Sequence, residues 1–599
     1  MKLNPYAGAW KYFLVFRRHI GRRMYLVFGL AIVAALAEGV GITLLLPLLA
    51  TLDMGLGAAE NVPAPLMWVV ETLGVSGSML GILLLIGVVF VLKALLLFGY
   101  HAYSSILHAQ LQVELKGRLF DACREMSYGY YITRNTGHFV NVLNGQAEGL
   151  FRSFSNYKSF LSGVIQAAAY VGFAFLIAWQ MALALLVFGA LLLSLFTVLN
   201  NYVRQLSQKT ALEASQLNKA LVQSLQAFKY LTSTQKMARL GAKVKESVHR
   251  LASYSVRLGI WGAVTGTLRE PLALAFIIAM IAVHVGVLGQ PLAPIIVAIL
   301  LLYRGMNAIL GVQSAWQYTM GSIGSVEMVE LELEGLHAHR EENGARVLGP
   351  LQHQIELKNV SFSYKDELGN ALSDISLTIP ARATVAFVGE SGAGKSTLID
   401  LLTLLLKPQQ GELLIDGVPG REVELASWRS QIGYVSQETV IFDDSIAANI
   451  ALADIDPADT QTLARVHDAA RKAHLAHFID TLPEGYHTLV GDRGVLLSGG
   501  QRQRLFIARE LFKEPNLLIL DEATSALDTE SEREIQRSID ELRGSLCVVI
   551  IAHRLSTIRN VDRVFVLQSG RLLEQGRYDE LTEVATSRFR RMVDLQALR

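Results

Sequence analysis

The stretch Gly389-Glu390-Ser391-Gly392-Ala393-Gly394-Lys395-Ser396-Thr397 decides how the second half of this chain folds. It fits the pattern G-x-x-x-x-G-K-[ST], whose glycines let successive backbone N–H groups curl around nucleotide phosphates. Lys395 adds a positive charge, and Ser396 offers a hydroxyl to Mg²⁺. The pattern therefore predicts a site for ATP and Mg²⁺, with the nucleotide contacted by Gly389, Ser391, Gly392, Gly394, Lys395, Ser396 and Thr397.

The sequence around this loop alternates short apolar strands with helices. The strand that ends at Val388 leads into the loop, and a helix begins near Lys395, which is the context that the pattern requires. Strand–helix alternation predicts a mostly parallel α/β sheet. The expected strands are Ala383–Val388, Ile432–Val435, Leu517–Leu520, Cys547–Ile551 and Val564–Leu567.

Two carboxylates end one of these strands. Asp521 is placed to hold Mg²⁺ through water, and Glu522 is placed to take a proton from the attacking water. The alternative is that both acids merely cap a buried strand. The phosphate loop in the same domain favours the catalytic interpretation.

The first half of the chain has a different composition. The net charge is only +1 and hydrophobic residues make up 51%, which argues against nucleic acid as a partner. The apolar residues gather in the first part of the chain, in runs of about 20 to 27 residues that can cross a bilayer. Six transmembrane helices are expected, at 24–50, 79–103, 159–178, 180–202, 262–288 and 292–318. We therefore expect an α-helical polytopic membrane domain (1–335), a linker (336–354) and an α/β P-loop nucleotide-binding domain (355–599).

The connections between the expected helices sort by charge. Lys and Arg are frequent before the first span and in the long segments that follow the second and fourth spans, whereas Thr51–Ser78 contains neither. By the positive-inside rule, both termini and the nucleotide-binding domain are expected in the cytoplasm. The long charged segments are amphipathic, so they are expected to continue the membrane helices into the cytosol.

A second motif, Leu497-Ser498-Gly499-Gly500-Gln501, stands about a hundred residues after the loop. With it, the C-terminal part of the chain resembles the nucleotide-binding domain of the ATP-binding-cassette (ABC) family, and every motif is present in family order. The resemblance implies that Tyr364 stacks on adenine and that Gln437 contacts Mg²⁺ and the lytic water. It also implies a signature (Ser498, Gly499, Gly500, Gln501), a D-loop (Ser525-Ala526-Leu527-Asp528) and a contact from His553 to the γ-phosphate.

The resemblance also implies a second chain. In this family the signature of one nucleotide-binding domain completes the phosphate site of another, and this chain has one set of motifs. Because Glu522 and the signature are intact, a homodimer with two competent sites is the simplest expectation. The alternative is a heterodimer in which this chain is the intact partner.

Six spans ahead of a nucleotide-binding domain on one polypeptide resemble the exporter half-transporters of the same family. Tyr130–Gly137 resembles the segment that docks on the nucleotide-binding domain, and Glu38–Ile42 with Pro47 resembles exporters of glycolipids and lipid-linked oligosaccharides. This resemblance implies an integral protein of a bacterial inner membrane, whose partners are the lipid bilayer and an amphipathic or lipid-linked cargo. The expected function is ATP-driven export or flipping of an anionic lipid-linked glycan or lipid. The alternatives are a multidrug or hydrophobic-peptide exporter, and an ATP-gated regulator or channel.

Five ionisable residues fall inside the apolar runs: Glu38, Lys93, Arg269, Glu270 and Arg304. An unpaired charge there costs about 2.5–3.5 kcal/mol, so these residues are expected to pair with one another or to face a cavity. One interpretation is internal ion pairing, such as Glu38 with Lys93. The other is a substrate site in which Lys93, Arg269 and Arg304, with Glu38, hold an anionic head group.

Apolar residues also recur between the first two spans, at Leu66, Met67, Val69, Val70 and Leu73. Their spacing predicts a short amphipathic helix in the outer interface of the membrane. The alternative is a plain external loop with a hydrophobic lid.

Overall fold

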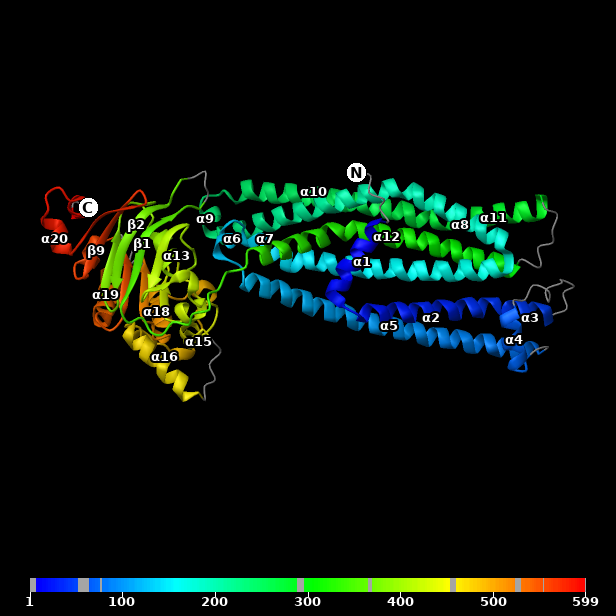
Figure 1. Cartoon of the computed structure of the whole chain (residues 1–599), viewed down its shortest axis with the longest axis horizontal. Coiled ribbons are helices and arrows are strands. Elements are labelled where there is room, and N and C mark those ends of the chain that lie inside the picture. The colour runs from blue at the N-terminus through cyan, green and yellow to red at the C-terminus, as the bar shows by residue number, and fades with distance from the viewer. Residues whose placement is uncertain are drawn as a thin grey trace. The chain divides into compact units, whose positions relative to one another are not determined.

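The computed structural model describes residues 7–51, 64–75, 78–287, 296–364, 369–452, 459–522, 529–552 and 554–597. The chain divides into two units (Figure 1). The first comprises Met1–Met126 and Tyr130–Arg340, and the second comprises Ser127–Gly129 and Glu341–Arg599. The division after Arg340 lies inside the segment 336–354 that we expected to be the linker.

The first unit is built from helices (Figure 1). A helix satisfies every backbone hydrogen bond within its own segment, as an apolar environment requires. The α-helices of this unit are α1 (Ala7–Ile20), α2 (Arg23–Thr43), α3 (Leu45–Thr51), α4 (Ala64–Thr72), α5 (Met79–Arg124), α6 (Tyr128–Ile132, whose first two residues belong to the second unit), α7 (Thr136–Val140), α8 (Ala147–Gln226), α9 (Phe228–Ser233), α10 (Met237–Thr267), α11 (Arg269–Ile281) and α12 (Ile296–Ala338). Single π-helical turns at Asn141–Gln146 and Ala282–Val287 adjoin α8 and α11.

The long helices continue past their apolar parts. Helix α5 has 46 residues and α12 has 43, which corresponds to about 69 Å and 65 Å, whereas the apolar core of a bilayer is about 30 Å thick. Each of these helices therefore continues without a break from an apolar part into a charged part, as expected for segments that extend the membrane helices.

The expected third and fourth spans form one element, α8, in which Ala178 leaves the helical region (φ −146°, ψ 75°). Among the described residues, five helical stretches are long and apolar enough to cross a membrane, so the expected count of six is not confirmed. The chain nevertheless reverses near Ala178. A Cβ added at Gly305 of α12 would lie 2.9 Å from Leu185 and 3.6 Å from Tyr170, although a straight helix would separate these two residues by about 22 Å. The two halves of α8 therefore run antiparallel beside α12.

A polar cluster holds α6 and α7 against the C-terminal part of α12. The Glu332 carboxylate accepts a 3.0 Å hydrogen bond from the Tyr130 hydroxyl and lies 2.7 Å from Nε2 of His138. Glu332 is 3% exposed, and these contacts compensate for the burial of its carboxyl group. The segment Tyr130–Gly137 thus forms parts of two short helices.

The predicted short helix between the first two spans is present as α4. Its Val70 is 2% exposed and packs with Leu44, at the end of α2. Trp68 and Leu73 are exposed, at 66% and 56%. The side chains of Leu66 and Val69 lie outside the described residues. The position of α4 in the outer interface of a membrane stays a prediction.

Two sheets organise the second unit (Figure 1). The larger has the strand order β10-β9-β3-β8-β7-β6, and the smaller, antiparallel sheet has the order β2-β1-β4-β5. The strands are β1 (Gln354–Phe362), β2 (Leu372–Pro380), β3 (Thr384–Val388), β4 (Gln410–Ile415), β5 (Val418–Pro419), β6 (Ile432–Val435), β7 (Leu517–Asp521), β8 (Cys547–Ile551), β9 (Arg563–Gln568) and β10 (Arg571–Gly576). The helices are α13 (Lys395–Leu402), α14 (Leu425–Arg429), α15 (Ile446–Ala451), α16 (Thr460–Lys472), α17 (Ala476–Ile479), α18 (Gly499–Phe512), α19 (Thr529–Leu542), α20 (Tyr578–Glu583) and α21 (Arg588–Ala597).

The middle of the larger sheet is parallel and buried. Strands β3, β8, β7 and β6 pair in parallel, and every residue of β3, β7 and β8 is buried. Continuous apolar strands of this kind are typical of a sheet covered on both faces. Because parallel strands end at the same edge, the residues that follow β3, β6 and β7 come together there.

Candidate functional site

The phosphate loop connects β3 to α13, and two glycines allow its shape. Gly394 has a φ of 101°, and a Cβ there would lie 2.6 Å from the Leu372 side chain. A Cβ at Gly389 would lie 2.3 Å from the carbonyl oxygen of Leu567. Any larger residue would therefore open the loop, which curls at the N-terminus of α13, where the helix dipole favours phosphate.

Lys395 folds back over the loop. Its Nζ donates hydrogen bonds to the carbonyl oxygens of Gly389 (2.8 Å) and Glu390 (3.0 Å). Burial lowers the pKa of Lys395, and the charges of Glu522 and Asp521 offset part of that effect. The amine thus lies where phosphate oxygens could replace the two carbonyls, next to the exposed Ser396.

The two expected carboxylates lie at the end of β7: Asp521 is its last residue and Glu522 follows it, and β8 lies between β7 and β3, the strand that precedes the loop. The Tyr434 hydroxyl donates to Oδ2 of Asp521 at 3.4 Å, which is long for such a bond. Glu522 has a φ of 52°, and its Oε2 accepts a 2.7 Å hydrogen bond from Nε2 of Gln437. A left-handed glutamate is costly unless its surroundings enforce it, and such residues cluster at functional sites. The structure therefore brings together Glu522 and Gln437, two of the predicted catalytic residues.

Tyr364 lies beside the first turn of α13. Its hydroxyl is 3.2 Å from Oγ1 of Thr397, and its ring meets Phe362 edge to face with centroids 5.1 Å apart. Tyr364 is 44% exposed, so a ring face is available for stacking. Its contact with adenine stays a prediction.

Asp400 and Tyr434 belong to this region but were missed by the sequence analysis. Burial raises the pKa of Asp400 to about 6, and the charge of Asp521 adds to that rise. Asp400 follows Thr397 by three residues on α13, and this spacing places both side chains on one face of the helix. That spacing was the available signal for Asp400. Tyr434 has no comparable signal in the sequence.

The signature residues begin helix α18. Ser498 is its N-cap: its Oγ accepts from the Gln501 N–H at 3.2 Å, and Gln501 Oε1 accepts from the Ser498 N–H at 2.8 Å. This reciprocal capping box fixes the start of the helix. Ser498 and Gly499 are exposed and Gly500 is buried. The positive end of the α18 dipole is therefore accessible to an anion.

Two predicted contacts lie outside the described residues. They are His553, which follows β8 in the chain, and the D-loop Ser525–Asp528, whose Asp528 was a predicted nucleotide contact. Their roles stay predictions.

The membrane unit brings three of the four candidate substrate residues together. Oε2 of Glu38 lies 2.8 Å from Nζ of Lys93, and Oε1 of Glu38 lies 3.8 Å from Nη1 of Arg304. The side chain of Glu38 is 8% exposed, whereas that of Arg304 is 53% exposed. The Glu38–Lys93 pair is the ion pair that the sequence analysis offered as the alternative to a substrate role.

Arg269, the fourth candidate, binds the backbone of α12. Its Nη2 donates to the carbonyl oxygen of Asn307 at 2.8 Å. The guanidinium group also lies against Gly311, where an added Cβ would be 3.5 Å away. Arg269 thus contacts α12 one to two turns beyond Arg304.

Comparison with known proteins gives matches for both units. The family profile described as ABC transporter transmembrane region matches residues 24–310, and the profile described as ABC transporter matches residues 372–525. The heterocyst differentiation ATP-binding protein HepA of Nostoc sp. is 32% identical over 580 residues, which are 94% of this chain and 93% of the relative. The ATP-dependent lipid A-core flippase of Haemophilus influenzae (strain 86-028NP) is 33% identical over 490 residues, which are 78% and 80% of the two chains. A solved structure of a bacterial Atm1-family ABC exporter with ATP bound is similar over 96% of this chain and 98% of its own, with a TM-score of 0.77 and 26% identity.

Proposed function

The chain belongs to the ABC transporter family, and we propose that it flips or exports an anionic, amphipathic lipid as one half of a dimer in a bacterial inner membrane. Its nucleotide-binding domain makes it an ATPase whose hydrolysis is coupled to transport. The observation that carries the choice of cargo is the half-exposed Arg304 beside the Glu38–Lys93 pair inside apolar helices. Relatives named lipid A-core flippase, from Haemophilus and Photobacterium, support a lipid cargo.

The residues at the sheet edge fit ATP and Mg²⁺. The loop glycines, Lys395 and Thr397 would hold the phosphates, while Ser396, Asp521 and Gln437 would hold Mg²⁺ directly or through water. When bound, Mg²⁺ neutralises charge on the phosphates. Glu522 would accept the proton of the attacking water, and the amide of Gln437 fixes the orientation of its carboxylate.

The other half of the proposed transporter is a second copy of this chain. In the proposed cycle, ATP closes two nucleotide-binding domains on each other, the membrane domains turn the cargo site outward, and hydrolysis resets them. The exposed N-terminus of α18 supports this arrangement, because the positive end of its helix dipole suits the phosphate of a facing domain. Native mass spectrometry of the purified protein is expected to give twice the mass of one chain. Two chains of different mass would contradict the homodimer.

Six membrane crossings, with both termini in the cytoplasm, are part of the proposal. The reversal at Ala178 supports a third and a fourth crossing within α8, and the charge of the connections supports the orientation. With Cys123 and Cys547 replaced, a cysteine at Trp179 is expected to react with an impermeant maleimide on intact cells, and one at Lys243 is not. The reverse pattern would overturn the orientation.

The cargo experiment measures ATPase activity in lipid nanodiscs. Purified lipid A-core is expected to stimulate the wild-type protein, and the Arg304→Ala variant is expected to lose most of that stimulation while keeping its basal rate. Arg257→Ala, which removes an exposed arginine on α10, is the matched control. The Glu522→Gln variant reports the background rate.

The Glu38–Lys93 ion pair also supports one competing class of cargo. Since Glu38 already neutralises Lys93, the membrane unit could carry a neutral hydrophobic drug. Stimulation by neutral drugs and none by lipid A-core would favour the multidrug exporter and would return the membrane charges to a structural role.

A further inference from the structure

The C-terminal end of the phosphate-loop helix is held by side chains from a neighbouring helix. Helix α13 has eight residues and ends at Leu402, so its last carbonyl groups need partners from outside the helix. Trp428 of α14, which is fully buried, donates from Nε1 to the Leu402 carbonyl at 2.9 Å. Arg429, the next residue, donates from Nε to the Thr403 carbonyl at 3.2 Å and from Nη2 to the Leu404 carbonyl at 2.7 Å.

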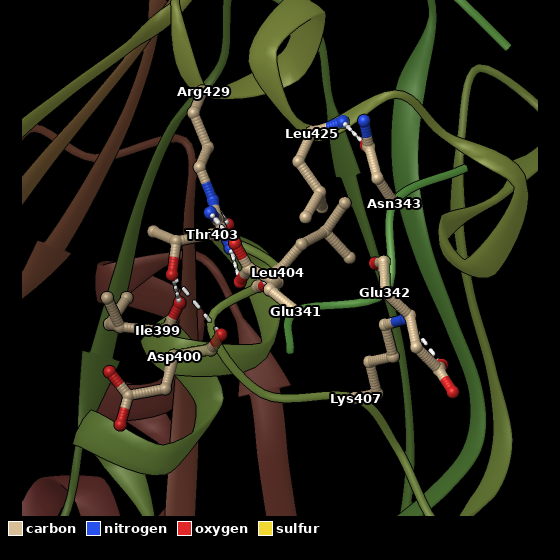
Figure 2. Close-up of polar contacts among 10 residues, drawn as sticks. All are labelled: Glu341, Glu342, Asn343, Ile399, Asp400, Thr403, Leu404, Lys407, Leu425 and Arg429. Carbon is tan, nitrogen blue, oxygen red and sulfur yellow. Dashed lines mark hydrogen bonds and ion pairs between the residues drawn. The ribbon is translucent and has the colours of Figure 1, made fainter. Parts of the chain in front are cut away.

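Arg429 is held from its other side by Glu341. Its Nη1 and Nη2 donate to the two carboxylate oxygens of Glu341 at 2.8 Å and 2.6 Å, so the pair is bidentate (Figure 2). Both side chains are largely covered, at 30% and 24% exposed. Only an arginine has the planar fork that can bind a carboxylate and two carbonyls at once. Glu341 is the first residue of the second unit after the long helix α12 and its short connection.

The neighbouring residue makes a contrasting contact. Glu342 pairs with Lys407 at 2.9 Å, also shown in Figure 2, but its side chain is 85% exposed. Lys407 also donates to the Glu342 carbonyl oxygen at 3.0 Å, but its ammonium group lacks a planar fork, and exposed pairs of this kind contribute little. The Glu342–Lys407 pair is therefore a matched control for the Glu341–Arg429 pair.

Arg429 also stands just before a second part of the ATP site. Helix α14 leads directly into β6, which ends at Val435, two residues before Gln437. The Arg429 guanidinium group therefore joins two parts of the second unit, its first residue after α12 and the C-terminal end of the phosphate-loop helix. Arg429 itself stands three residues before β6 in the chain.

We propose that Arg429, held by Glu341, is a positioning residue that sets the place of the phosphate loop by fixing the opposite end of α13. A helix of eight residues is about 12 Å long and stiff, so a shift at Leu402 is passed to Lys395 at its other end. The tie is tight because Leu404 is buried and left-handed (φ 56°), a conformation that the surrounding contacts must enforce. This inference concerns ATP binding and does not depend on the identity of the cargo.

The test compares Arg429→Lys and Glu341→Gln with Lys407→Gln in the full-length protein in nanodiscs. Arg429→Lys keeps the positive charge but loses the planar guanidinium group. Glu341→Gln removes the carboxylate charge that binds this guanidinium group. We expect KM for ATP to rise about tenfold for Arg429→Lys and about threefold for Glu341→Gln, with kcat changed less than twofold, because saturating ATP pulls the loop back into place. Lys407→Gln is expected to match the wild type.

A second measurement separates positioning from stability. The melting temperature is recorded with and without the non-hydrolysable analogue AMP-PNP and Mg²⁺. A displaced loop gives a smaller rise at a fixed analogue concentration, because that rise depends on affinity. Wild-type KM and a wild-type rise in Arg429→Lys and Glu341→Gln would overturn the proposal, even if both variants melted earlier. An equal effect of Lys407→Gln would also overturn it, because attachment of the connecting segment in general would then be responsible.

Discussion

The ATP site and the membrane charge cluster both contain acids and cations, but they use them differently. In the ATP site, Lys395 donates to backbone carbonyls and Glu522 accepts from a neutral amide, so these groups can change partners when a nucleotide arrives. In the membrane cluster, Glu38 and Lys93 lie 2.8 Å apart and bind each other. The charges of the ATP site are thus held by neutral partners, whereas the charges of the membrane pair neutralise each other. Arg304, at 3.8 Å and half exposed, lies between these two cases.

The largest effect is expected at Glu522. Glu522→Gln removes the proton acceptor while keeping the hydrogen-bonding shape, so the ATPase rate should fall by about 100-fold or more. Binding of a fluorescent ATP analogue should remain, because the loop and Lys395 are unchanged. Phosphate release and analogue binding measured on one preparation check this. A variant that keeps a tenth of the wild-type rate would assign the proton acceptor to another residue.

The next effect is expected at Glu38. Glu38→Gln leaves Lys93 without its partner among apolar helices, and breaking a buried pair from one side costs about 3 kcal/mol. Thermal unfolding in detergent should show a marked loss. Replacing both residues, with Glu38→Gln and Lys93→Met, should recover much of it. The control is Glu246→Gln, since Glu246 is 67% exposed in its pair with Arg250. Equal stability of Glu38→Gln and this control would mean that the membrane pair does not support the fold.

An effect on stability whose size depends on pH is expected at Asp400. Its folded-state pKa of about 6 is above the unfolded value of about 3.9, so the folded state keeps this proton more tightly. The residue therefore destabilises the fold increasingly as pH rises from about 4 to about 6, and by a constant amount above that. Asp400→Asn should stabilise the protein by up to about 3 kcal/mol at pH 7.5 and hardly at all at pH 4. Denaturant unfolding at the two pH values checks this, and a benefit that is equal at both would contradict the assignment.

The smallest effect on stability is expected at Arg304. Because its side chain is half exposed and 3.8 Å from Glu38, Arg304→Ala should cost less than about 1 kcal/mol. Lys93→Ala, measured in the same thermal assay, should cost clearly more. If the two variants lose the same stability, Arg304 belongs to the fold as much as Lys93 does, and the case for a cargo contact weakens.

The two regions also differ in how far their sequences predicted them. The phosphate loop, the Asp521–Glu522 strand and the signature each need several residues at fixed spacing, because one backbone segment must make several contacts with one nucleotide. That constraint made the α/β domain and most of its site predictable. The membrane charges are single residues on separate helices, so the sequence indicated their chemistry but not that Arg269 binds α12 while Arg304 approaches Glu38.

The turn expected between the third and fourth spans, 159–178 and 180–202, coincides with Ala178, where α8 leaves the helical region. One further feature could not be predicted, for a physical reason. The Glu341–Arg429 pair joins residues far apart in the chain, and neither belongs to a spaced motif. Contacts made by one side chain with another, across a fold, leave no periodic pattern in the sequence.

The unbroken length of α12 has a mechanical consequence. Glu332 stands roughly 28 residues beyond Arg304 on this helix, which is about 42 Å along the axis. A tilt of one degree about Arg304 therefore displaces Glu332 by about 0.7 Å, and the 2.7 Å and 3.0 Å contacts of its carboxylate with His138 and Tyr130 tolerate little more than that. If cargo binds at Arg304 as proposed, a small rotation of α12 there would make or break the hydrogen bonds of Glu332 with α6 and α7.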